Sequence, residues 1–213
     1  MRVLLTAFEP YEQWKENSSW LTLMELLKDR PPKPELVTRR YPVELPAMRD
    51  RLYKDLQAGF DAVIHLGQSP GSPQIKLELI AVNAAGRVEN CGDELSVIEE
   101  HGPVAYRSGL PLGRWAKTLR EKQIPTIVSY HAGTFLCNAT LYSSLHLSRG
   151  MSPAPLVGFF HLPLTMQQAA TSTQPLPSMD VRTMAAAVRW MLEDLDENYQ
   201  SPQGSRSLAA ELA

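Results

Sequence analysis

Cys137 stands where an apolar segment gives way to a stretch with helical periodicity. Residues 126–130 before it are β-branched and aromatic, as in a buried strand, and Gly133 supplies the backbone freedom for a sharp turn. After it, leucines recur at helical spacing until a basic, glycine-terminated end at Arg149-Gly150. A thiol in the first turn of a helix faces unpaired N–H groups and the positive end of the helix dipole, which favours the thiolate. Cys137 is therefore a candidate nucleophile.

The position of Cys137 also fits a simpler alternative, a small buried hydrophobic residue, which is the commonest fate of a free cysteine. A catalytic thiol needs a base, and the chain has 5 histidines that could supply one. His146 lies about half a helical turn out of phase with Cys137 and roughly 13 Å along the axis, so we expect it not to reach the thiol. His101 lies in an irregular stretch and is predicted to be solvated.

The other three histidines lie in or beside predicted strands. His65 is interpreted as a hydrogen-bonded core residue, and His131 shares a strand end with the nucleophile turn. His161 is the strongest candidate for the base because it lies near the carboxyl end of a strand that we expect beside the strand before Cys137. It could accept the thiol proton and later donate it to a leaving amine. A core imidazole remains an alternative of comparable weight.

A third group should orient such an imidazole, and Glu78 is a candidate. It places a carboxylate within the apolar run Leu77-Glu78-Leu79-Ile80, where an unpaired charge would be costly. The alternative, which the residues alone favour, is a pair of Lys76 and Glu78 on a solvated sheet face.

The predicted elements alternate between strand and helix, which favours a three-layer α/β/α fold with a twisted, largely parallel central sheet flanked by helices. The strand with Arg39 and Arg40 should lie near an edge. We expect strands over 2–8, 36–43, 61–67, 75–83, 126–130 and 156–164. We expect helices over 46–58 and 112–122, a helix capped by Asn17-Ser18-Ser19, a helix that begins at Cys137, and a last helix capped by Ser178. The irregular excursion from Ala84 to Pro111 is typical of a lid or binding loop.

Length and composition narrow the functional classes. At 213 residues the chain suits one well-buried core, so we expect a single catalytic domain over 1–197 and a flexible polar tail over 198–213. A net charge of −2 without a basic block predicts no binding to nucleic acid or to an anionic membrane. Two cysteines, Cys91 and Cys137, without a signal segment indicate the reducing cytoplasm. No metal-ligand spacing is found, so we predict no metal and no cofactor.

Several segments together resemble the pyroglutamyl peptidase I family of cysteine peptidases. Thr6-Ala7-Phe8-Glu9-Pro10-Tyr11 is similar to the opening motif of the family. The segments His65-Leu66-Gly67-Gln68 and Leu77 to Asn83 resemble the region of its catalytic glutamate. Ala132 to Asn138 is similar to its nucleophile motif, and Phe159-Phe160-His161-Leu162-Pro163 to its histidine strand. The resemblance spans about residues 1–195.

The resemblance implies a role for each matching position. Cys137 would be the nucleophile, His161 the general base and then acid, and Glu78 the orienting carboxylate. The family releases an N-terminal pyroglutamyl residue through a thioester. The lactam ring would lie among aromatic and polar residues, and the oxyanion would be met by the Cys137 N–H and by Arg87. The implied ring-binding residues are Phe8, Tyr11, Asn17, Gln68 and Phe135.

Two other functions remain open at this level. Glu12-Gln13 stands where the family usually has two glycines, which leaves room for an amidase acting on another small lactam or acyl amine. A non-catalytic ligand-binding α/β protein would leave Cys137 inert. The resemblance also implies a homo-oligomer, a dimer or a tetramer, and peptides with N-terminal pyroglutamate as partners.

Overall fold

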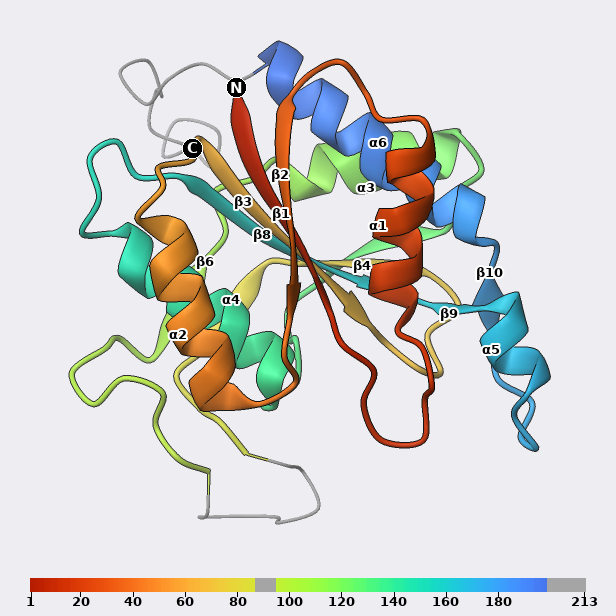
Figure 1. Ribbon diagram of the computed structural model, residues 1–213, viewed down its shortest axis with the longest axis horizontal. Helices are drawn as coiled ribbons and strands as arrows, with labels where there is room; N and C mark the ends of the chain where they lie inside the picture. Colours follow the sequence, from red (N-terminus) through yellow and green to blue (C-terminus); the bar gives the residue numbers. More distant parts are fainter. Residues whose placement is uncertain (87–94, 199–213) are drawn as a thin grey trace, which may run out of the picture.

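A six-stranded sheet organises the part of the chain that the computed structural model describes, residues 1–86 and 95–198. Its order is β2-β1-β3-β8-β4-β7 (Figure 1). The first four strands in this order are parallel, whereas β4 pairs antiparallel with β8 and parallel with β7. Its strands are β1 (Arg2–Phe8), β2 (Glu35–Tyr41), β3 (Ala62–Gln68), β4 (Ile75–Glu78), β7 (Thr126–Ser129) and β8 (Leu156–Leu162). Two small sheets pair β5 (Ile80–Val82) with β6 (Ala105–Arg107) and β9 (Leu164–Thr165) with β10 (Ser178–Met179).

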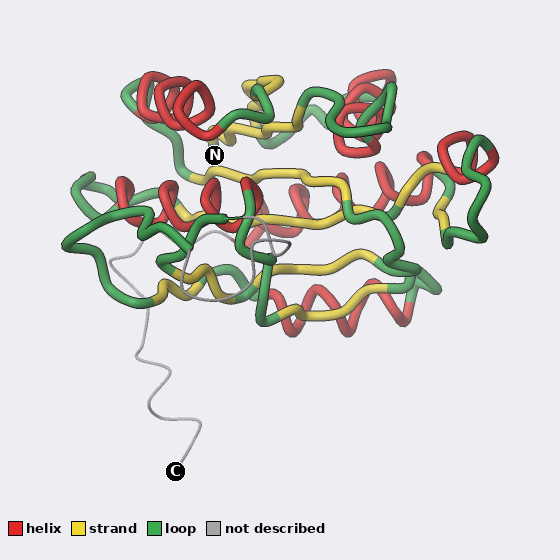
Figure 2. The backbone as a smooth tube through the Cα atoms, turned by 90° about the horizontal axis from the view of Figure 1, so that it is seen from below, coloured by secondary structure: helices red, strands yellow, loops and turns green. Residues whose placement is uncertain are grey.

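Helices cover both faces of this sheet (Figures 1 and 2). They are α1 (Ser18–Lys28), α2 (Leu45–Leu56), α3 (Leu112–Glu121), α4 (Leu136–Ser148), α5 (Met166–Ala170) and α6 (Val181–Asn198). Because side chains alternate along a strand, Val3 and Leu5 pack with α1, α3 and α6, while Leu4 and Phe8 pack with α2 and α4. This arrangement confirms the predicted three-layer fold with a largely parallel sheet.

Two local predictions about the first third of the chain are confirmed. Asn17 caps α1, because its side-chain oxygen accepts the Ser19 N–H at 3.0 Å. The strand that carries Arg39 and Arg40 is β2, which forms one edge of the main sheet.

The prediction of one strand over 75–83 is wrong. The segment divides at Leu79 into β4, which belongs to the main sheet, and β5, which pairs with β6 inside the excursion from Ala84 to Pro111. The Leu79 N–H donates to Ser129 O at 2.7 Å, and its carbonyl accepts the Ser108 N–H at 2.9 Å. Two different chain segments therefore hold the backbone at Leu79, and the strand turns out of the main sheet there.

The predicted cap of the last helix is also wrong. Ser178 lies in β10, and the N-cap position belongs to Asp180, whose Oδ1 accepts the N–H groups of Arg182 at 2.8 Å and Thr183 at 3.3 Å. A carboxylate fits this position because it also interacts favourably with the helix dipole. The predicted flexible tail lies outside the described residues except for Asn198, which ends α6.

Candidate active site

His161 and Glu78 form a buried pair across the junction of β8 and β4. The Nδ1 of His161 lies 2.8 Å from Oε1 of Glu78. The two strands are antiparallel, with Lys76 opposite His161 and Glu78 opposite Phe159, so both side chains project toward the face that α4 covers. Glu78 is fully buried and His161 is 7% exposed.

Cys137 reaches this pair by a route different from the predicted one. The strand before it, β7, does not lie beside β8, because β4 is inserted between them. Since β7 also runs opposite to β8, the carboxyl ends of the two strands do not meet. The thiol is instead carried on the first turn of α4, which packs against β8 and β5, and it interacts with His161 by hydrogen bonding and charge.

The electrostatics of His161 follow from these two partners. Burial by itself lowers the pKa of an imidazole, but the Cys137 thiolate and the Glu78 carboxylate more than compensate and raise the pKa of His161 to about 9. Near neutral pH the imidazole is therefore protonated when it faces the thiolate. The geometry supports an ion pair of thiolate and imidazolium that a carboxylate orients.

The alternative reading of Glu78, a surface pair with Lys76, is not what the structure contains. Lys76 Nζ donates to Ser69 Oγ at 3.5 Å instead. The second carboxylate oxygen of Glu78, Oε2, is buried and lacks a hydrogen-bond partner among the described residues. An unsatisfied carboxylate oxygen in the core is costly, which favours a role for Glu78 beyond packing.

The turn before α4 leaves backbone donors available next to the thiol. Gly133 has φ of 79°, which a residue with a side chain rarely adopts, and its N–H donates to His131 Nδ1 at 2.9 Å. His131 is therefore engaged in its own turn. Phe135 is the N-cap of α4 and makes no side-chain capping bond, so the Cys137 N–H in the first turn has no intrahelical acceptor.

Two hydrogen-bonded clamps fix this turn to the excursion. Gly86 N–H donates to Thr134 O at 2.8 Å, and Thr134 Oγ1 donates to Gly86 O at 3.0 Å. Asn138 accepts the Val82 N–H and donates to Val82 O and Ala84 O, each at 2.9 Å. Residues 82–86 are thus tied to the residues flanking Cys137. Arg87, the predicted second oxyanion donor, lies outside the described residues.

A small pocket of about 70 Å³ opens beside the thiol. It holds all five predicted ring-binding residues together with the nucleophile, and three further residues, Val43, Gly67 and Leu136, that were not predicted to bind the ring. The lining is Phe8, Tyr11, Asn17, Val43, Gly67, Gln68, Phe135, Leu136 and Cys137. Val43, Gly67 and Leu136 have no polar side chain, so their types do not indicate a binding role. They line the pocket because the fold brings their segments together there.

The polar groups of this pocket differ in how they are used. Asn17 is occupied within the protein: Nδ2 donates to Glu9 O at 3.0 Å, and Oδ1 accepts from Ser19. Burial raises the pKa of the Tyr11 phenol well above its ordinary value, and the nearby Cys137 thiolate acts in the same direction. Tyr11 is therefore a neutral hydroxyl at the pocket wall.

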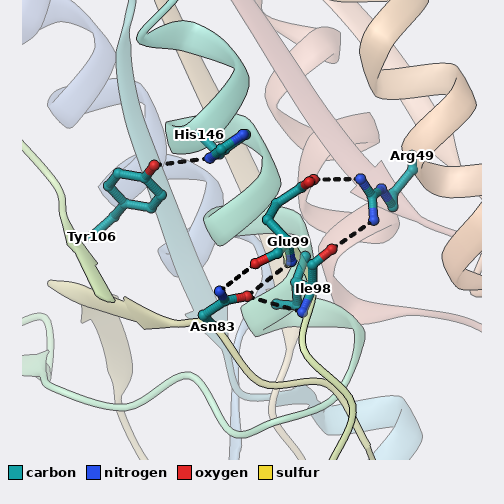
Figure 3. A network of polar contacts seen from close by, with 6 residues as sticks. All are labelled: Arg49, Asn83, Ile98, Glu99, Tyr106 and His146. Carbon is teal, nitrogen blue, oxygen red and sulfur yellow. Dashed lines mark hydrogen bonds and ion pairs between the residues drawn. The ribbon is translucent and has the colours of Figure 1, made fainter. Parts of the chain in front are cut away.

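The remaining histidines are all accounted for outside this site. His65 is fully buried and pairs with Thr6 and Ser144, as expected of a core histidine, and His101 is exposed. The Nδ1 atom of His146 lies 2.9 Å from the hydroxyl oxygen of Tyr106 (Figure 3).

The same view shows how the excursion is fastened to the rest of the molecule. The Asn83 side chain accepts the N–H groups of Ile98 and Glu99 and donates to Glu99 O at 2.7 Å (Figure 3). Arg49 of α2 donates to Ile98 O at 3.0 Å and pairs with the Glu99 carboxylate. This part of the excursion is thus a hydrogen-bonded structure anchored on α2.

Fold and site together define a class: an α/β protein with the thiol, imidazole and carboxylate that cysteine hydrolases use. One known protein family matches the chain over most of its length. The sequence profile described as pyroglutamyl peptidase matches residues 1–197, and the chain belongs to this family.

Named relatives agree with that assignment. The chain is 35% identical over 192 residues to the pyrrolidone-carboxylate peptidase of Thermococcus onnurineus (strain NA1), covering 88% of this chain and 94% of the relative. It is 33% identical over 211 residues to that of Bacillus subtilis (strain 168), covering 96% and 98%. The crystal structure of the pyrrolidone carboxyl peptidase from Fervidobacterium islandicum AW-1 superposes with a TM-score of 0.86 at 35% identity, covering 92% of this chain and 99% of that one.

Proposed function

We propose that this protein is a cysteine peptidase that removes an N-terminal pyroglutamyl residue from peptides. The observation that carries the proposal is the pocket beside Cys137, whose lining is aromatic, aliphatic and amide, with no carboxylate among the described residues. A free α-ammonium buried there would lack a partner, whereas a flat, uncharged lactam needs none. The family membership supports the same substrate.

In the proposed mechanism the Cys137 thiolate attacks the carbonyl carbon between pyroglutamate and the next residue. His161, held by Glu78, gives its proton to the amide nitrogen as the C–N bond breaks and the peptide amine leaves. A thioester between Cys137 and the pyroglutamyl carbonyl remains. Water then attacks this carbon as His161 takes the proton of the water, the C–S bond breaks, and the thiolate and imidazolium are restored.

The negative oxygen formed in both steps needs donors that are already in place. The Cys137 N–H in the uncapped first turn of α4 is the proposed donor, assisted by the dipole of the helix. Arg87 remains the proposed second donor on the strength of the family resemblance.

The pocket residues have proposed roles that follow from their chemistry. Phe8, Tyr11 and Phe135 offer rings against which the flat lactam can pack. Gln68 offers an amide to the lactam, and Asn17 holds the loop that carries Tyr11.

The test is release of a fluorescent amine from its pyroglutamyl amide by wild type and by Cys137→Ala, with the prolyl amide as the control substrate. Turnover by wild type only, and of the pyroglutamyl amide only, is expected. Turnover of other acyl amides in preference would favour the alternative amidase. A folded wild type that turns over neither, and whose Cys137 alkylates slowly at neutral pH, would indicate a non-catalytic binding protein.

The surroundings of the reaction are also proposals. We propose a reducing cytoplasm as the location of the protein, because it would keep the Cys137 thiol active. No helix among the described residues is both long and apolar enough to cross a membrane. One catalytic domain over 1–197 is supported by the extent of the family match. A homo-oligomer, a dimer or a tetramer, is supported by the resemblance, and analytical ultracentrifugation of the full chain would test it.

A further inference from the structure

Gln68 is a wall residue of the pocket whose amide is held from the far side. It is 5% exposed, and its buried Nε2 makes no hydrogen bond of good geometry among the described residues, although the Tyr11 hydroxyl, also at the pocket wall, interacts with the Gln68 side chain. Its Oε1, by contrast, accepts two hydrogen bonds, from the Ser18 N–H at 2.7 Å and from Gln168 Nε2 at 2.7 Å. Because the Ser18 N–H can only donate, Oε1 must face α1 and Nε2 must face the pocket.

Gln168 of the short helix α5 is fixed just as firmly. Its Oε1 accepts the Thr165 N–H at 3.0 Å, within the capping box that begins α5. Its Nε2 donates to Glu16 O at 3.0 Å as well as to Gln68. A backbone donor on one side and a backbone carbonyl on the other leave the amide a single orientation.

The two amides therefore form a chain of defined polarity. It runs from the Thr165 N–H through the side chain of Gln168 to the side chain of Gln68, and each donor has a matching acceptor until the Gln68 Nε2. This group carries two N–H bonds and faces the pocket beside the Tyr11 hydroxyl, so at least one N–H is left for a ligand. A buried donor without a partner is costly, and a carbonyl oxygen of a ligand would remove that cost.

We propose that Gln168 is a positioning residue that sets the substrate specificity of the pocket. It holds the Gln68 amide so that an N–H group faces the bound ring, and the pocket therefore selects rings that carry a carbonyl oxygen. This rests on the proposed function, since the ring would be the lactam of pyroglutamate. In this proposal Gln168 does not touch the substrate, because its side chain reaches from α5 to Glu16 in the loop before α1 and contacts the side of Gln68 that faces α1.

Replacing Gln168 by Glu tests the polarity of the chain with little change in shape. The carboxylate can still accept the Thr165 N–H but cannot donate to Gln68 Oε1, and two acceptor oxygens then face each other. Gln68 is pushed to turn its Nε2 away from the pocket. Gln167→Glu is the matched control, because Gln167 is the exposed neighbour in the same helix and the change in charge is identical.

Two substrate analogues isolate the carbonyl. The 3-oxocyclopentanecarbonyl amide of the fluorescent amine keeps the ring carbonyl and lacks the ring N–H, and the cyclopentanecarbonyl amide lacks both. We expect Gln168→Glu to lower the ratio of their kcat/KM values about tenfold or more. For the pyroglutamyl amide, KM should rise more than kcat falls, because ring binding is the same in the ground state and the transition state. Gln167→Glu should change neither.

Binding without turnover separates this proposal from the proposed function. The dissociation constant of 2-pyrrolidone, measured by NMR titration of wild type and both variants, should rise about tenfold in Gln168→Glu only. If wild type binds 2-pyrrolidone but cleaves no pyroglutamyl amide, the proposed function fails and the role of Gln168 stands. Equal losses for both analogues, or equal binding of 2-pyrrolidone in Gln168→Glu and wild type, would reduce Gln168 to a structural part of α5 and overturn the proposal. Absence of binding of 2-pyrrolidone to wild type would overturn the proposed role of Gln168, whereas the proposed function stands or falls with the release of amine from the pyroglutamyl amide.

Discussion

His65 and His161 lie on neighbouring strands of one sheet, on the same face, and both are buried, yet their acid–base behaviour is opposite. The pKa of His65 is lowered to about 3, because burial acts on it without a charged partner. Its ring nitrogens lie 2.6 Å from the Thr6 hydroxyl and 2.8 Å from the Ser144 hydroxyl. His65 is thus a neutral core residue over the whole physiological range.

His161 is almost as deeply buried as His65, but its pKa is shifted in the opposite direction. Burial lowers its pKa too, but the Cys137 thiolate and Glu78 raise it to about 9. The Phe159 ring contacts both imidazoles, with ring centroids 6.1 Å from His65 and 4.8 Å from His161. The Phe159 surroundings are therefore shared, and the charged partners of His161 account for the difference in pKa between the two histidines.

The largest effect should come from removing the charge of Glu78. Glu78→Gln keeps the size of the side chain but no longer stabilises the imidazolium, so we expect kcat/KM for a pyroglutamyl amide to fall about a thousandfold to ten-thousandfold. The exposed Glu100→Gln serves as the control and should retain full activity. Activity of Glu78→Gln within tenfold of wild type would contradict the assigned role.

Acid should reveal the cost of burying His65. Its folded-state pKa of about 3 lies below the unfolded value of about 6.5, so the unfolded state binds the proton first and the free energy of unfolding decreases as the pH falls from about 6.5 toward 3. The full loss is roughly 5 kcal/mol. His161 adds no slope in this range, because its raised pKa keeps it protonated in both states below about 6.5.

Urea unfolding of wild type and His65→Gln between pH 7 and pH 4 measures this difference. The variant should be less stable at pH 7 but should lose the His65 part of the pH dependence. His101→Gln, at an exposed histidine, should follow wild type. Parallel pH dependence in wild type and His65→Gln would remove His65 as the source.

A larger residue at position 67 should displace the Phe159 ring, which contacts both His65 and His161, and should therefore disturb both histidines. A Cβ on Gly67 would lie 2.5 Å from two carbon atoms of the Phe159 ring and 3.3 Å from Cδ2 of His161. We expect Gly67→Ala to cost about 1 to 3 kcal/mol of stability and to lower activity. Thermal unfolding and the amide assay measure the two effects. In Gly113→Ala, where a Cβ meets nothing within 4 Å, stability should be equal or higher.

The smallest effect, and the most direct, concerns the pKa of His161 itself. Cys137→Ala removes the thiolate that supports the imidazolium, so the pKa of His161 should fall below about 9 by about one unit or more. NMR titration of the imidazole signals measures the shift, and His65 in the same spectra is the internal control. The wild-type rate should correspondingly fall as the pH rises through about 9, where the imidazolium loses its proton. An unchanged pKa of His161 in Cys137→Ala would mean that Glu78 alone maintains it.

Local chemistry made several features predictable from the sequence. The turn at Gly133 and the helix after Cys137 follow from a residue type that tolerates positive φ and from leucine spacing. The segment Asn17-Ser18-Ser19 was predicted to cap α1 because a short polar side chain can accept a backbone N–H there, and Asn17 is the residue that does so. These signals are encoded within a few residues and do not depend on distant parts of the chain.

The errors involve partners far apart in the sequence. The strand over 75–83 divides because Ser108 and Ser129 bind the backbone of Leu79. The expected contact between the strand of His161 and the strand before Cys137 fails because β4 is inserted between them. Strand order depends on the whole set of packed faces, which hydrophobic periodicity in one segment cannot encode.

The sequence alone determined the residue types of the site, the alternation of strands and helices, and, through family resemblance, the grouping of Cys137, His161 and Glu78. Tertiary structure decided that the carboxylate of Glu78 is buried against the imidazole rather than paired with Lys76. It also decided which amide atom of Gln68 faces the pocket. The physical reason is that charge state and hydrogen-bond direction depend on partners up to about a hundred residues away, and only the folded chain brings those partners within about 3 Å.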